Sequence, residues 1–80
     1  MSAEELAISD SICMLVGYKF GDERCKLLSA ALYAAKHNLP VGSPRRVFIQ
    51  DLAAALNRRN ILSNEKVDQF LRLGFRYMEI

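Results

Sequence analysis

The stretch SPRRVFIQDLAAALNRR, residues 43–59, shows most clearly how this chain folds. Its apolar residues recur every three or four positions, which places them on one face of a helix. They are Phe48, Ile49, Leu52, Ala55 and Leu56. Ser43 suits an N-cap and Pro44 suits the first helical position. The stretch therefore predicts an amphipathic helix.

The same apolar spacing predicts three further helices. We expect them at about residues 3–18, 23–37 and 63–77. Ser2 and Glu5 fit a capping box, and Asp22 and Ser63 suit N-caps. The tail RYMEI, residues 76–80, could continue the last helix or leave it as an extended segment. Four short helices with short connections predict an all-α, compact single domain over residues 1–80.

Small residues mark places where helices can approach closely. Ala30, Ala31, Ala34 and Ala35 give the second helix a small-residue surface. Gly74 costs about 1 kcal/mol inside a helix relative to alanine. It marks either a close helix contact or the end of the last helix.

The composition predicts a partner. Of the 80 residues, 51% are hydrophobic, and a chain this short buries only about 60% of the surface that it exposes when unfolded. Apolar surface left over usually marks an interface, often with a second copy. The net charge of +2 is too small to imply a polyanion by itself. We therefore expect a homodimer or a protein partner, with nucleic acid as a further possibility.

The cysteines and the apolar runs suggest a location. Cys13 and Cys25 are too few for a disulfide scaffold, so we expect packed thiols in a reducing compartment. A redox role for Cys25, near a helix start, is the less favoured alternative. No apolar run approaches the roughly 20 residues of a membrane span, and no signal-peptide pattern is visible. These features predict a cytoplasmic protein with no membrane partner.

The sequence contains little catalytic chemistry. His37 is the only histidine, and it suits the last turn of the second helix. Neither metal-binding spacings nor a phosphate loop is present. We therefore expect no enzyme, no metal, no cofactor and no small-molecule substrate.

Arginines near aromatic residues point to an interaction surface. Aromatic residues, methionine and arginine are enriched at protein interfaces. The predicted partner-binding residues are Arg45, Arg46, Arg72, Phe75, Arg76, Tyr77 and Met78. They favour a small regulatory protein that binds another macromolecule, as an adaptor or inhibitor. Alternatively, the aromatic residues fill the core of the domain itself.

A second hypothesis is a dimeric helix-turn-helix regulator that binds DNA through the last two helices. The residues that would contact nucleic acid are Arg58, Arg59, Asn64, Lys66 and Gln69. Two features argue against it. The joint NRRNILS, residues 57–63, lacks glycine, and Glu65 and Asp68 would repel phosphates.

Overall fold

The structure is a computed structural model that describes residues 2–19, 21–38 and 42–80. Its four helices are α1 (Ala3–Leu15), α2 (Glu23–His37), α3 (Arg45–Arg58) and α4 (Asn64–Glu79). The described residues contain no strand. The predicted all-α class is therefore confirmed.

The starts of the helices follow the predicted caps with one shift. The Ser2 hydroxyl accepts the Glu5 N–H at 3.1 Å, and the Asp22 carboxylate accepts the Arg24 N–H at 2.8 Å. Pro44 has a ψ of 154°, so it is the N-cap of α3, and Arg45 is the first helical residue. The helix thus begins one residue later than Ser43 and Pro44 indicated.

The ends of two helices differ from the sequence prediction. α1 ends at Leu15 rather than near residue 18, and Gly17 follows with a φ of 86°, which favours glycine. The chain turns there because side-chain-bearing residues rarely adopt that backbone conformation. The tail does not leave α4, since the helix continues to Glu79.

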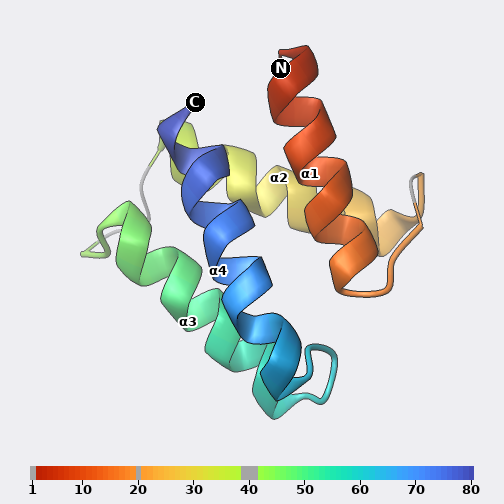
Figure 1. The fold of residues 1–80 in the computed structure, drawn as a ribbon. Coiled ribbons are helices and arrows are strands. Elements are labelled where there is room, and N and C mark those ends of the chain that lie inside the picture. Colours follow the sequence, from red (N-terminus) through yellow and green to blue (C-terminus); the bar gives the residue numbers. More distant parts are fainter. Residues whose placement is uncertain (1, 20, 39–41) are drawn as a thin grey trace.

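α4 makes the most extensive contacts of the four helices, with α3 and with α1. It packs against α1 on one side and α3 on the other, and α2 crosses behind them in Figure 1. α3 and α4 form an antiparallel hairpin. The hydrophobic core draws on all four helices and contains Ile12, Leu32, Ile49, Leu62, Phe70 and Tyr77 at 0% exposure.

Gly74 lies inside α4 where this helix meets α3. A Cβ atom at this position would lie 2.9 Å from Ile49 Cγ2 and 3.0 Å from Ile49 Cδ1. Of the two explanations for Gly74, the structure therefore supports close helix contact, and α4 continues for five residues beyond it.

The two cysteines join α1 to α2. Cys13 and Cys25 are both buried, as expected, but they form a disulfide rather than two packed thiols. Their Cα atoms lie 5.4 Å apart, within the range that a disulfide spans. The prediction of free cysteines was wrong because residues 12 positions apart in sequence meet when α2 folds back on α1.

Candidate interaction surface

Asn57 organises the turn between α3 and α4. Its side-chain amide donates to the Leu62 carbonyl at 3.0 Å and to Asn64 Oδ1 at 2.8 Å. Asn60 adopts a φ of 58°, a conformation that asparagine tolerates better than most residues. The turn thus reverses the chain without a glycine.

Contacts along the hairpin keep one antiparallel register over its whole length. Asn57 meets Asn64 at the turn, Ile49 meets Gly74 in the middle, and Arg45 meets Met78 at the open end. The 14 residues of α3 span about 20 Å at 1.5 Å per residue. Most members of the two predicted sets of binding residues are therefore held toward opposite ends of the hairpin, whereas Gln69 and Arg72 lie three residues apart in the middle of α4.

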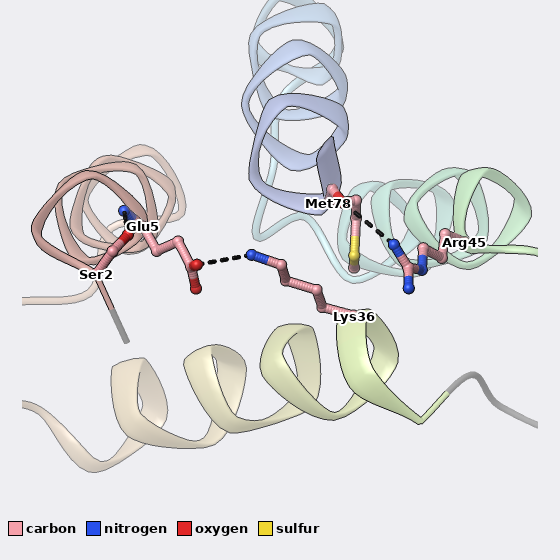
Figure 2. Close-up of polar contacts among 5 residues, drawn as sticks. All are labelled: Ser2, Glu5, Lys36, Arg45 and Met78. Carbon is pink, nitrogen blue, oxygen red and sulfur yellow. Dashed lines mark hydrogen bonds and ion pairs between the residues drawn. The ribbon is translucent and has the colours of Figure 1, made fainter. Parts of the chain in front are cut away.

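The open end of the hairpin carries what we call the arginine–aromatic surface. A pocket of about 310 Å³ there is lined by Arg45, Arg46, Phe75, Met78 and Glu79. The Arg46 guanidinium lies 4.6 Å from the centre of the Phe75 ring, a cation–π contact. Arg45 donates to the Met78 carbonyl at 3.4 Å, a long hydrogen bond seen in Figure 2. The structure thus brings together four of the seven predicted partner-binding residues.

The electrostatics of this surface favour an anionic ligand. Arg45 and Arg46 are exposed in the first turn of α3, which contains no acidic residue, and the helix has no side-chain cap. Positive side chains at a helix start are unfavourable for the helix itself, because the dipole is positive there. Glu79 supplies the one carboxylate in the pocket lining. An acidic group would therefore meet two guanidinium ions and the uncapped helix end.

Arg72 and Arg76 lie on the exposed side of α4. Arg76 Nη2 is 3.5 Å from Glu4 Oε1, and both side chains are more than half exposed. An exposed pair of this kind contributes little to stability. Neither arginine lines the pocket, so they flank the arginine–aromatic surface rather than belong to it.

Tyr77 belongs to the core rather than to a contact surface. Its side chain is 0% exposed, and Met78 is 6% exposed. Lys36 Nζ lies 5.5 Å from the centre of the Tyr77 ring. Burial raises the pKa of the Tyr77 hydroxyl, and the Glu5 carboxylate adds to this effect. The role of exposed anchor predicted for Tyr77 is therefore corrected, and Phe75, which is half-buried, is the aromatic residue that a partner can reach.

Glu5 and Lys36 form an ion pair that the sequence analysis missed. Glu5 Oε1 and Lys36 Nζ are 2.8 Å apart, and their side chains are 13% and 7% exposed. Figure 2 shows the pair bridging α1 and α2. The hydrogen bond from Lys36 lowers the pKa of the Glu5 carboxyl. No sequence signal links the two residues. From the sequence, Lys36 is already explained as a cation in the last turn of a helix.

The residues proposed for nucleic-acid binding lie toward the turn of the hairpin. They are all exposed: Arg58, Arg59, Asn64, Lys66 and Gln69. A pocket of about 440 Å³ beside the turn includes Asn64 and Lys66 in its lining. In a helix-turn-helix the two helices cross at about 90–120°. The antiparallel packing of α3 and α4 differs from that arrangement.

The described part of the chain gives no sign of a metal centre or a membrane span. Its His, Cys, Asp and Glu side chains form no group of three that could hold a metal ion. None of the helices in those residues combines the length and the apolar character needed to cross a bilayer.

Comparison with protein families, with curated protein sequences and with solved structures finds no match to this chain.

Proposed function

We propose that this chain is a small, non-enzymatic interaction protein whose arginine–aromatic surface binds an acidic segment of a protein partner. The observation that carries the proposal is the packing of exposed Arg46 on half-buried Phe75, beside exposed Arg45. Apolar contact from Phe75 and charge from the arginines would act on one bound segment. Charged residues at such a surface mainly set orientation and association rate.

A peptide titration tests this proposal. The probe is a fluorescent peptide of alternating glutamate and leucine, and a lysine–leucine peptide serves as the charge control. We expect micromolar binding of the acidic peptide only, weakened about tenfold by Arg46→Glu. Arg58→Glu is the matched control, because Arg58 is an exposed arginine at the far end of the same helix. Equal losses in both variants, or no binding of the acidic peptide, would refute the proposal.

DNA binding at the turn is the second candidate. The exposed residues Arg58, Arg59 and Lys66 favour it because they lie toward the same turn, and the antiparallel hairpin speaks against base reading by α4. The test is anisotropy of labelled duplex DNA at about 50 and about 200 mM salt, where phosphate contacts weaken steeply. Arg58→Ala with Arg59→Ala should weaken that binding. Absence of binding at the lower salt concentration would remove this candidate.

We also propose that the protein acts as a homodimer. Large apolar side chains remain exposed on the folded chain, among them Leu27 at 66% and Tyr33 at 41%, both on α2. A cytoplasmic location remains a prediction. The Cys13–Cys25 disulfide weighs against it, because disulfides are rare in a reducing cytosol.

A further inference from the structure

α2 carries an apolar face that no other described part of the chain covers. Its exposed aliphatic and small residues between the two ends are Leu27, Ala30, Ala31 and Ala34, and the exposed Lys26 and Tyr33 border them along one side. The exposed side of α4 contrasts with it, because Glu65, Asp68, Arg72 and Arg76 occupy equivalent positions there. α4 has thus a normal solvated face, whereas the exposed face of α2 resembles a contact surface.

Charged and polar residues close this face at both ends. Glu23 begins α2 and His37 ends it, and both are exposed. Five residues along this face are spaced at alternating steps of four and three positions: Glu23, Leu27, Ala30, Ala34 and His37. This spacing is the seam of a coiled coil, in which every member faces the same neighbouring helix.

We propose that the α2 helices of two copies pack antiparallel against each other along this face, which deepens the homodimer already proposed. The seam is acidic at its start and carries N–H donors of His37 at its end. Only a reversed copy places unlike ends together, with Glu23 against the partner's His37. The helix dipoles then also run in opposite directions.

The residue sizes fit the same arrangement. The register that pairs Glu23 with the partner's His37 puts the two-fold axis at Ala30, which meets its own copy. Leu27 then lies within one residue of level with the partner's Ala34, so that a large side chain packs beside a small one at both symmetric positions. Self-complementary contacts of this kind define a closed two-fold dimer rather than an open chain.

The size of the face sets the expected affinity. The 15 residues of α2 span about 22 Å at 1.5 Å per residue. A stable interface buries about 800 Å² on each partner, more than one short helix face supplies. We therefore expect a reversible dimer with a dissociation constant in the micromolar range.

Leu27→Glu tests the surface, and Met14→Glu is its matched control. Both side chains are about two-thirds exposed, but Met14 lies on α1 outside the seam. Sedimentation equilibrium should show at least about tenfold weaker association for Leu27→Glu and unchanged association for Met14→Glu. Wild-type protein that stays monomeric at high micromolar concentration, or equal effects of the two variants, would overturn the proposal.

A charge exchange tests the antiparallel direction. Glu23→Lys alone and His37→Glu alone should each dimerise less well, because each places like charges or two donors opposite one another. A mixture of the two variants restores both unlike pairs and should form a mixed dimer, detected by native mass spectrometry. If the mixture associates no better than its components, the antiparallel register is wrong.

The same variants separate this inference from the binding function. The arginine–aromatic surface lies on α3 and α4, away from the seam. Leu27→Glu should therefore still bind the acidic peptide, and Arg46→Glu should still dimerise. If the protein is monomeric but binds the peptide, only the dimer is refuted. If the protein dimerises but does not bind the peptide, only the binding function is refuted.

Discussion

Glu5 shows how a tertiary contact replaces a local one. In a complete capping box, the Glu5 carboxylate would accept a hydrogen bond from the Ser2 N–H. Only the first half of the box forms, in which the Ser2 hydroxyl accepts the Glu5 N–H. The carboxylate pairs with Lys36 instead, at 2.8 Å. The reason is the burial of Lys36, since a buried ammonium ion without a partner is very unfavourable.

Removing the charge of Glu5 should change how stability depends on pH. Lys36 lowers the pKa of Glu5 below 4.5 in the folded state. A lowered pKa stabilises the fold above the unfolded value, and this contribution is lost as the pH falls through the folded value. Glu5→Gln should therefore be less stable than wild type at neutral pH and lose less stability on acidification below 4.5.

Urea denaturation at about pH 7 and about pH 3 measures this difference. Glu4→Gln is the control, because Glu4 is 62% exposed and its pair with Arg76 is 3.5 Å long. Its stability should stay within about 0.5 kcal/mol of wild type. If Glu5→Gln keeps the acid sensitivity of wild type, the Glu5–Lys36 pair does not contribute to the fold.

Tyr77 allows the hydroxyl and the ring to be tested separately. The hydroxyl is buried and has no hydrogen-bond partner among the described residues. Tyr77→Phe should therefore be neutral or stabilising by about 1 kcal/mol, because a buried unpaired hydroxyl is unfavourable. Tyr77→Ala should cost about 3–5 kcal/mol, since a ring-sized cavity forms in the core.

Thermal and urea unfolding of both variants checks these values. The raised pKa of Tyr77 also makes the wild type less stable as the pH rises above 10.0, and Tyr77→Phe should lack that part of the loss. A large loss of stability in Tyr77→Phe at neutral pH would mean that the hydroxyl has a partner.

At the scale of elements, the hairpin of α3 and α4 depends on one glycine. The capping residues and the apolar spacing predict both helices, but not the side on which they meet. Gly74 and Ile49 decide that, because the absent side chain lets the two helices approach closely. Asn57 then fixes the turn through two hydrogen bonds.

Gly74→Ala should destabilise this hairpin even though alanine favours helices. The helix gains about 1 kcal/mol from the substitution. Against that, the added methyl group overlaps the fully buried Ile49 side chain, and overpacking costs about 1–3 kcal/mol. We expect a net loss of about 1 kcal/mol in urea denaturation. In an Ile49→Ala background the same substitution should stabilise the protein, and additive effects of the two changes would contradict the contact.

At the scale of the whole molecule, the disulfide ties α1 to α2. It closes a loop with a sequence separation of 12. Constraint of such a loop in the unfolded chain is worth about 2–3 kcal/mol in the chain-entropy description. An 80-residue domain has about 4–12 kcal/mol in total, so this is a large share.

Reduction should therefore lower the melting temperature by more than about 8 °C. Calorimetry with and without a phosphine reductant measures the change, and a thiol assay confirms that the bridge has opened. The variant Cys13→Ser with Cys25→Ser should have a melting temperature close to that of the reduced protein, and the reductant should not change it. A fully reduced wild type that melts unchanged would show that packing alone holds α1 on α2.

The sequence by itself determined the elements of this protein. Apolar residues at helical spacing and the side-chain caps Ser2 and Asp22 act within a few neighbouring residues, so the four helices could be predicted; Ser63 takes the N-cap position of α4 without a side-chain hydrogen bond. Only the tertiary structure decided the Cys13–Cys25 bridge, the Glu5–Lys36 pair, the burial of Tyr77 and the grouping of Arg46 with Phe75. Each of these joins different helices or depends on their relative rotation. Spacing within one helix carries no information about that rotation, because it is set by how the packed faces fit together.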